Sequence, residues 1–132
     1  MQFVAAYAEL WCLSNFSFLR GASRPEELVA RARQLGYTAL AVADECSMAG
    51  IVRAHVAAKE QGLKLLVGSQ FRVDCEAPFT FIVLACDMQG YGNLCQFITR
   101  LRRTSEKGTY HLARDDIVPD ELSRCVVLAA PD

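Results

Sequence analysis

The sequence lacks the signatures of several common protein classes. No two of its six cysteines form a C-x-x-C pair, which argues against a zinc cage or a thioredoxin-type redox motif. It has no run of about 18 or more apolar residues and no basic start followed by a long apolar stretch, so we expect neither a membrane span nor a secretory signal. It also lacks a Walker-type phosphate loop and the paired glycines of a dinucleotide site.

Charge of either sign is not in excess. Lys and Arg number 14 against 15 for Asp and Glu, and the net charge of -1 gives no global attraction for nucleic acid or acidic lipid. The 132 residues are 52% hydrophobic, which favours one packed domain over disorder. Because Cys12, Cys86 and Cys125 lie in apolar runs and no signal directs the chain outward, we expect reduced thiols and a cytoplasmic location.

Apolar segments and helical patterns alternate along the chain. We expect strands over 3–10, 38–43, 63–67 (extended or followed by 71–73), 79–85 and 125–130. This alternation favours an α/β fold with a parallel sheet and helical crossovers. Periodicity does not distinguish an open sheet from a barrel.

Three helices are expected between these strands. The first begins with a capping box of Ser23 and Glu26, with Pro25 in its first turn, and ends at Gly36. The second covers 48–61 and ends at Gly62, and the third follows a turn at 87–92. The apolar face of the second helix is expected to hold Met48, Ile51, Val52 and His55, and that of the third Leu94, Phe97, Ile98 and Leu101. A polar loop over 105–114 and one helical turn at 119–122 complete the assignment.

Polar residues gather where three of the strands end. These strand-to-loop junctions cover 10–21, 42–50 and 63–71. Function sits at the carboxyl ends of the strands in parallel α/β folds, so the three junctions mark the expected site.

In order and separation, the junctions resemble the opening motifs of the PHP (polymerase and histidinol phosphatase) domain. The resemblance is closest to the PHP domain that begins the error-prone relatives of the bacterial replicative DNA polymerase alpha subunit, and it extends to 15–23, 53–60 and 90–95. It implies a partial (β/α) barrel with mainly parallel strands. A whole PHP domain is longer, so the resemblance implies that 1–132 is a single domain corresponding to the N-terminal half, a fragment of a longer polymerase.

The same resemblance implies a degenerate metal site. Active PHP sites carry His-x-His, Asp-His and Glu in the three motifs and often a histidine at the fourth strand. The aligned residues here are Trp11 and Leu13, Asp44 and Glu45, Gln70, and Thr80. The indole nitrogen of tryptophan only donates a hydrogen bond and has no lone pair to offer a metal, and leucine has no ligand atom at all. Neither residue therefore binds a metal. We expect no catalytic residue and no bound metal, with Asp44 and Glu45 as weak candidate ligands, and a buried Trp11 in place of the metal.

Asp44 and its neighbours also have a structural interpretation. Asp44 is expected to cap the following helix or to accept backbone hydrogen bonds. Ser14 and Ser17 are expected to shape the loop before Gly21, where Arg20 can pair with an acid.

The histidines and the basic loop favour no chemistry. His55 is expected to pack against the apolar face of its helix and His111 to be solvated. Tyr110 beside Lys107 and an arginine cluster suits either contact with a nucleic-acid backbone or, as we prefer at this net charge, a solvated face.

The resemblance therefore predicts an N-terminal PHP-like segment of a DNA-directed DNA polymerase, a nucleotidyltransferase for damage-induced translesion synthesis, replication and repair. The segment would scaffold the polymerase and bind no cofactor, and Mg²⁺ would serve the parent enzyme alone. Expected partners are the rest of the polymerase chain, DNA through the parent enzyme, accessory translesion proteins and the sliding clamp, and no membrane. Two alternatives stay open: a free-standing PHP-type phosphoesterase using Asp44 and Glu45, and a non-catalytic interaction module docking a partner through surface residues of the helix at 94–101. The apolar strand at 125–130 would also allow a homodimer of the fragment.

Overall fold

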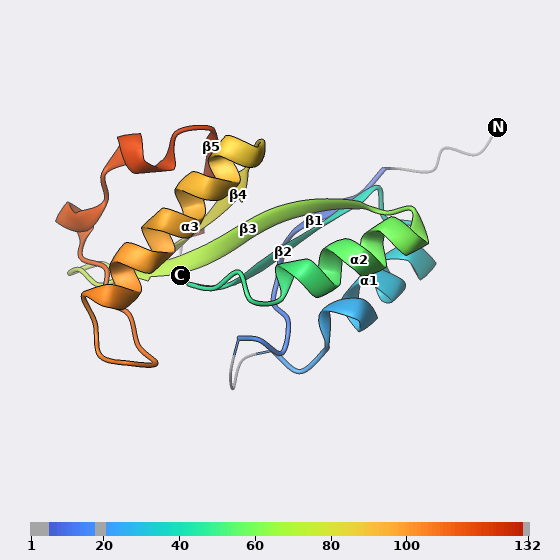
Figure 1. Ribbon diagram of the computed structural model, residues 1–132, viewed down its shortest axis with the longest axis horizontal. Coiled ribbons are helices and arrows are strands. Elements are labelled where there is room, and N and C mark those ends of the chain that lie inside the picture. Colours follow the sequence, from blue (N-terminus) through green and yellow to red (C-terminus); the bar gives the residue numbers. More distant parts are fainter. Residues whose placement is uncertain (1–5, 18–20, 131–132) are drawn as a thin grey trace.

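The protein is described by a computed structural model, which covers residues 6–17 and 21–130. The described part forms one five-stranded sheet with three α-helices (Figure 1). In chain order the elements are β1 (Ala8–Cys12), α1 (Pro25–Gln34), β2 (Ala39–Glu45), α2 (Ile51–Gln61), β3 (Lys64–Val73), β4 (Phe79–Ala85), α3 (Met88–Arg103), the 3₁₀ turns η1 (Arg114–Asp116) and η2 (Pro119–Leu122), and β5 (Cys125–Ala130).

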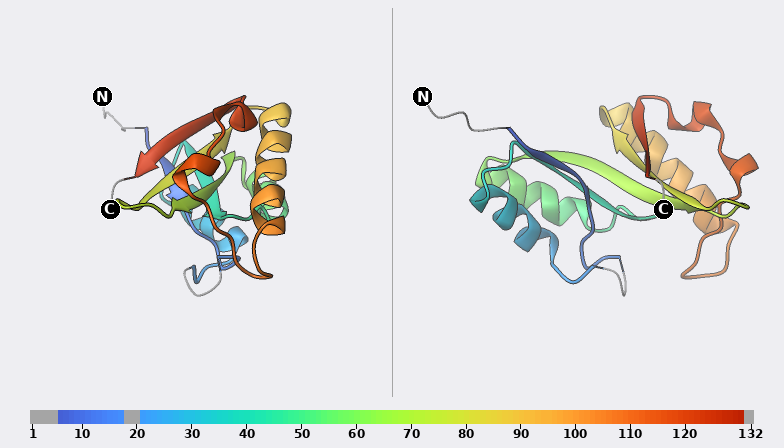
Figure 2. Two further views of the ribbon diagram at one scale, coloured as in Figure 1. Left: turned by 90° about the vertical axis from the view of Figure 1, so that its left-hand side faces the viewer. Right: turned by 180° about the vertical axis from the view of Figure 1, so that it is seen from behind.

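The strands lie in sequence order, β1 to β5, and their directions are mixed. Strands β1, β2 and β3 pair in parallel, whereas β3 with β4 and β4 with β5 pair antiparallel. The α/β class and the curled, partial-barrel sheet are as predicted (Figure 2). The prediction of mainly parallel strands holds for the first three and is wrong for the last two. The segment between β3 and β4 is too short for a crossover, so this connection is a hairpin.

The helices cover one face of the sheet, and the strands alternate between this face and the inner face of the curl. Leu40 and Val42 of β2 pack with α1 and α2. Ala41 and Ala43, which alternate with them along the strand, pack with β4 residues on the inner face instead. All four side chains are at most 2% exposed, so β2 is buried on both faces, as its unbroken apolar sequence predicts.

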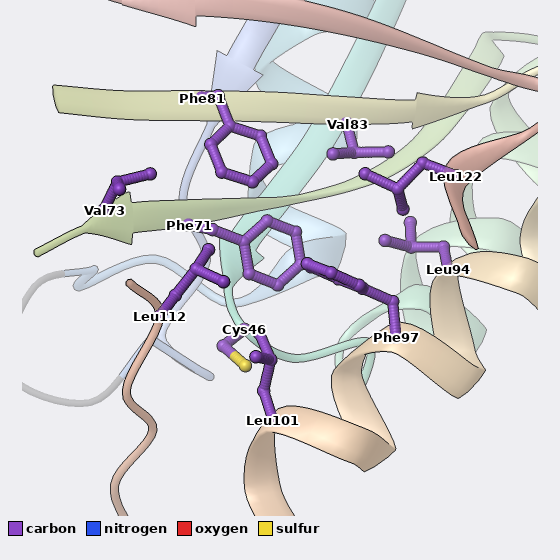
Figure 3. Close-up of a cluster of buried hydrophobic side chains, with 10 residues drawn as sticks. All are labelled: Cys46, Phe71, Val73, Phe81, Val83, Leu94, Phe97, Leu101, Leu112 and Leu122. Atoms are coloured by element: carbon purple, nitrogen blue, oxygen red, sulfur yellow. The ribbon is translucent and has the colours of Figure 1, made fainter. Parts of the chain in front are cut away.

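Helix α3 packs over β3 and β4 around Phe71 (Figure 3). The ring centroid of Phe71 lies 5.3 Å from that of Phe81 and 5.0 Å from that of Phe97, which meets it edge-on. Cys46 joins this cluster from the end of β2, and burial raises the pKa of its thiol to about 11. This core fixes the loop after β2 against α3.

Helix α1 ends as predicted but begins differently. Pro25 is its first residue and Gly36, with φ of +75°, follows its end. The predicted capping box is wrong, because starting the helix at Pro25 makes Arg24 the N-cap, and no side chain caps the helix there.

Helix α2 begins at Ile51 rather than Met48 and turns a different face inward. The buried residues are Ile51, Ala54, Ala57 and Ala58. Val52 is 69% exposed and His55 is exposed, so the expected packing role of His55 is wrong. Small alanines let α2 approach the sheet closely, an arrangement that a search for large apolar residues misses.

Helix α3 begins within the segment predicted to be a turn. Asp87 caps it by accepting a hydrogen bond of 2.9 Å from the Gly90 backbone N–H. Gly90 abuts the start of β5, where a Cβ atom would lie 2.1 Å from the Arg124 carbonyl oxygen. The glycine at this position therefore serves a close approach of the helix to the chain before β5 and does not form a turn.

Three further expectations concern the first strand, the cysteines and a membrane span. The first strand covers Ala8–Cys12 instead of 3–10, and residues 1–5 lie outside the described residues. All six cysteines are free. Within the described ranges, no helix is both long enough and apolar enough to cross a membrane.

Candidate functional site

The carboxylate of Asp44 is buried where β1 and β2 end. Asp44 is the penultimate residue of β2, and the loop after β1 brings Ser14 and Ser17 over it. Asp44 is 2% exposed, Ser14 0% and Ser17 4%. Gly50, before α2, completes the enclosure, since a Cβ atom there would lie 3.1 Å from Ser14 Oγ and 3.2 Å from Asp44 Oδ2.

Both oxygens of Asp44 accept hydrogen bonds from the β1 loop. The Ser14 backbone N–H donates to Oδ1 at 2.7 Å, and the Ser17 hydroxyl donates to the same oxygen at 2.8 Å. The Ser14 hydroxyl donates to Oδ2 at 2.6 Å. Asp44 thus accepts a backbone hydrogen bond, as expected, together with two hydroxyl bonds that the sequence did not predict. Charge-assisted bonds of this kind are short and strong, and they tie the β1 loop to β2.

The serine hydroxyls are themselves held by the backbone. Ser14 Oγ accepts from the Phe16 N–H at 3.1 Å, and Ser17 Oγ accepts from the Glu45 N–H at 3.0 Å. Each hydroxyl therefore has its donor turned toward Asp44. This network offers Asp44 hydrogen-bond donors in the directions from which a cation would have to approach, so the residues present do not fit a metal at Asp44.

Glu45 joins β2 to the loop after α3. The Tyr110 hydroxyl donates to Glu45 Oε1 at 2.7 Å and accepts from the Arg72 backbone N–H at 3.0 Å. Burial raises the pKa of Tyr110 above its usual value, and the bond to Glu45 adds to the effect. Since its hydroxyl is engaged within the fold, Tyr110 does not support the alternative of a nucleic-acid contact.

Arg102 of α3 strengthens the same junction. Its guanidinium donates to the Cys46 carbonyl oxygen from Nε at 3.2 Å and from Nη2 at 3.0 Å, and lies 5.4 Å from the centroid of the Tyr110 ring. A hollow of about 380 Å³ remains beside this junction. It is lined by Phe16, Ser17, Glu45, Arg102, Gly108, Thr109 and Tyr110.

Gln70 is buried on the face of the sheet opposite to that of Asp44. It pairs with Glu45 in the parallel register, whereas Asp44 pairs with Ser69. Successive side chains alternate between the faces of a sheet, so Gln70 and Asp44 point to opposite faces. The Gln70 amide donates to the Ala43 carbonyl oxygen at 2.7 Å, while its buried Oε1 has no partner among the described residues.

The remaining positions of the degenerate motifs do not converge on Asp44. Trp11 is 44% exposed, so the prediction of a buried indole replacing the metal is wrong. The pairing register of β1 is irregular between Glu9 and Cys12. Cys12 packs toward the helices, whereas the side chain of Trp11 is exposed at this edge of the sheet. Leu13 is partly buried, and Thr80 lies opposite Arg72, away from Asp44.

No metal cluster is preorganised in the part of the chain that the structure describes. There, no three His, Cys, Asp or Glu residues are grouped so that they could hold an ion. The histidines lie elsewhere: His55 is exposed on α2, and exposed His111 has its Nδ1 3.6 Å from Asp74 Oδ2. Arg20, proposed to pair with an acid, lies outside the described residues.

Ser69 is a participant that sequence reasoning missed. Its hydroxyl donates to the Asp44 carbonyl oxygen at 2.6 Å and accepts from the Ser47 N–H at 3.1 Å. The available signal was a small hydroxyl residue immediately before Gln70 in the third motif. With Ser14, Ser17 and Ser69, three serines surround the one residue that keeps its ligand type.

Comparison with known proteins places this arrangement in a family. The sequence model of the PHP domain matches residues 9–126. The chain belongs to the PHP domain family. The Asp44 network lies within the residues that the family model matches.

Curated relatives of this PHP chain are much longer proteins. The error-prone DNA polymerase of Methylococcus capsulatus is 53% identical over 128 residues, which are 97% of this chain and 12% of the relative. That of Dechloromonas aromatica is 57% identical over 129 residues, 95% of this chain and 12% of the relative. The chain thus spans about an eighth of the length of these relatives.

Solved structures share the PHP-like arrangement. One is a Bifidobacterium adolescentis protein described as a metal-dependent phosphoesterase, with a TM-score of 0.63 and 27% identity over 76% of this chain and 34% of that chain. Another is an amidohydrolase from Chromobacterium violaceum, with bound sulfate and no metal, a TM-score of 0.62 and 25% identity over 74% of this chain and 34% of that chain.

Proposed function

We propose that this chain is the N-terminal PHP segment of an error-prone DNA polymerase and that it has a structural role. The relatives named error-prone DNA polymerase support the parent enzyme, since they match nearly the whole chain at 53% and 57% identity. The Asp44 network supports the structural role, because it uses the retained ligand to join β1 to β2.

The network carries the proposal because it accounts, without a metal, for Asp44, the one position of the resembled motifs that retains the type of a metal ligand. A hydrolytic PHP site needs several ligands converging on an ion with an open position for water. Here the Asp44 oxygens are taken by Ser14 and Ser17, and Gln70 points to the other face. The segment would then contribute structural support to the polymerase and would not catalyse hydrolysis.

The finer parts of the proposal concern the parent enzyme. It would be a DNA-directed DNA polymerase acting in damage-induced synthesis, replication and repair in the cytoplasm, with Mg²⁺ at a nucleotidyl-transfer site outside this segment. The rest of the polymerase chain would be the direct partner of this segment. DNA, accessory translesion proteins and the sliding clamp would be reached through it.

A chimeric polymerase tests the structural role. The matching segment of the Dechloromonas aromatica relative is replaced by this chain, and primer extension is measured on intact and lesion-containing templates. We expect the chimera with the wild-type segment to extend primers. We expect less extension when the chimera also carries Asp44→Ala, because this substitution destabilises the segment. A chimera with the wild-type segment that resists limited proteolysis, and is therefore folded, but does not extend primers would contradict the proposal.

A second candidate is a phosphoesterase, which the similarity to the Bifidobacterium adolescentis structure favours. It predicts Mn²⁺-dependent hydrolysis of p-nitrophenyl phosphate by the isolated chain, abolished in Asp44→Asn. The structural proposal predicts that the wild-type chain shows no more metal-dependent hydrolysis than the Asp44→Asn variant does. The alternative of docking through surface residues of the helix at 94–101 stays a prediction, and the inward residues Leu94, Phe97 and Leu101, which are buried in the protein's own core, would take no part in it.

A further inference from the structure

The segment at 106–111, here called the strap, follows α3 and reaches the carboxyl end of β2. In Figure 1 it belongs to the orange loop that projects beyond the end of α3. Every residue of the strap is exposed except Tyr110, which is partly buried. The chain is fixed on either side of the strap. The Thr104 hydroxyl donates to the Arg100 carbonyl oxygen at 3.1 Å, and Leu112, which is 1% exposed, accepts from the Asp74 N–H at 2.8 Å through its carbonyl oxygen.

The strap bonds mainly to itself. The Thr109 N–H and hydroxyl both donate to the Glu106 carbonyl oxygen, at 3.0 Å and 2.8 Å. Among the described residues, the hydrogen bonds from the strap to the rest of the fold are those of the Tyr110 hydroxyl with Glu45 and Arg72. Few contacts and an exposed backbone are the marks of a segment that opens at low cost.

The Tyr110 hydroxyl takes the place of a neighbouring strand. Strand β2 ends at Glu45, which pairs with Gln70, whereas β3 continues to Val73. Beyond the end of β2, the Arg72 N–H donates to the Tyr110 hydroxyl, and this hydroxyl donates to the carboxylate of Glu45. One hydroxyl thus fastens the strap to two strands.

Tyr110 also separates two hollows. Tyr110 and Glu45 both line the hollow of about 380 Å³ beside Arg102, and both line a second hollow of about 290 Å³ beside Arg72. The bond between Tyr110 and Glu45 is therefore shared by the walls of the two hollows. Withdrawal of Tyr110 would join them into one groove over the ends of β2 and β3.

We propose that the strap opens and closes as a unit, latched by the Tyr110 hydroxyl, while the rest of the fold stays intact. Gly108 gives the closed strap its turn, with φ of +85° and no atom within 4 Å of the position of a Cβ atom. Opening breaks the bonds of Tyr110 with Glu45 and Arg72, and access to the joined groove then depends on the strap.

Hydrogen exchange of the Arg72 backbone N–H, followed by NMR, tests the proposal, because this group is bonded to Tyr110. The N–H of Val42, a fully buried residue of β2, reports on unfolding of the whole chain. In the wild-type chain we expect Arg72 to exchange at least about tenfold faster than Val42, after correction for intrinsic rates. Low urea should speed exchange at Val42 but hardly at Arg72, because local opening exposes little surface.

Two glycine variants separate opening of the strap from global unfolding. Gly108→Ala strains the closed strap and leaves the Tyr110 hydroxyl in place, so it should speed exchange at Arg72 at least about fivefold. Gly36→Ala is the matched control, because Gly36 has a φ of +75°, no atom within 4 Å of a Cβ position and a place at the end of α1. It should speed exchange at Val42 and leave Arg72 unchanged.

Two results would overturn the proposal. One is exchange of Arg72 at the rate and with the urea dependence of Val42, which would show that the strap opens only when the whole chain unfolds. The other is acceleration of Arg72 exchange by Gly36→Ala as large as that by Gly108→Ala.

Discussion

At the scale of single residues, the proposed role of Asp44 is to hold strand ends together, as a metal would in an active PHP site. An ion draws strand ends together by binding ligands from several of them. Asp44 draws β1 and β2 together by accepting three hydrogen bonds from Ser14 and Ser17. The retained acid and the lost histidines are therefore consistent with each other, because hydroxyl donors suit a carboxylate that has no cation.

Asp44→Ala should lower the free energy of unfolding by at least about 3 kcal/mol, since it removes charge-assisted bonds and leaves buried donors without partners. Urea denaturation of the two proteins measures the difference. Asp115→Ala, at an exposed position in η1, is the control and should change stability little. An Asp44→Ala variant as stable as the control would refute the anchoring role.

Tyr110 makes stability depend on alkaline pH. Its pKa is raised in the folded chain by burial and by the bond to Glu45, so the folded state holds the phenolic proton more tightly than the unfolded state does. This contribution is fully present below the unfolded pKa of about 10 and is lost as pH rises toward the folded value.

Tyr110→Phe should therefore cost about 1 kcal/mol near neutral pH, through the lost hydrogen bonds, and should lose less stability than wild type as pH rises past about 10. Urea denaturation at several pH values checks both effects. Parallel pH profiles for the two proteins would show that Tyr110 is not the titrating group.

At the scale of elements, the ends of helices depend on contacts that sequence patterns do not contain. The segment at 87–92 is predicted to be a turn, but Asp87 is the N-cap of α3 and residues 88–92 are its first part. Gly90 is needed because the helix approaches the carbonyl oxygen of Arg124, which immediately precedes β5 and lies more than 30 residues later in the chain. By contrast, Gly36 and Gly62 end their helices as predicted, because their positive φ angles are local requirements.

The two glycines of α3 should respond oppositely to alanine. Gly90→Ala places a Cβ atom 2.1 Å from the Arg124 carbonyl oxygen and should destabilise the protein by about 2 kcal/mol through overpacking. Gly92→Ala meets no atom within 4 Å and should stabilise it by about 0.5–1 kcal/mol through helix propensity. Thermal unfolding of both variants measures this pair of effects, and equal shifts would contradict the close packing of α3 on β5.

The faces of the elements were predicted less well than their positions. Strand β2 was recognised because a run of apolar residues is typical of a strand buried on both faces. The buried side of α2 was assigned to larger residues such as Val52, but the structure buries Ala54 and Ala58 instead. Trp11 was misplaced for a related reason, since the irregularity in β1 that turns it outward leaves no mark in the sequence.

At the scale of the whole molecule, the sheet changes direction at the β3–β4 hairpin. Alternating strands and helices predicted crossovers and a parallel sheet, and this holds for β1 to β3. The short turn before β4 and the long segment after α3 produce the antiparallel pairs, and β5 is left as an edge. Asp44 lies near the end of β2, as its motif predicts, whereas Gln70 lies within the longer β3, and its direction follows from register, which motifs do not specify.

The central claim is that hydrogen bonds, rather than a cation, join the strand ends at Asp44. Measuring the free energy of unfolding of the wild-type chain with increasing Mn²⁺ tests it most directly, because a ligand bound to the folded state stabilises it in proportion to the logarithm of its concentration. We predict no increase, and the same response for wild type and Asp44→Asn. A rise in stability with Mn²⁺ that is lost in Asp44→Asn would show that Asp44 is a metal ligand and would contradict the account.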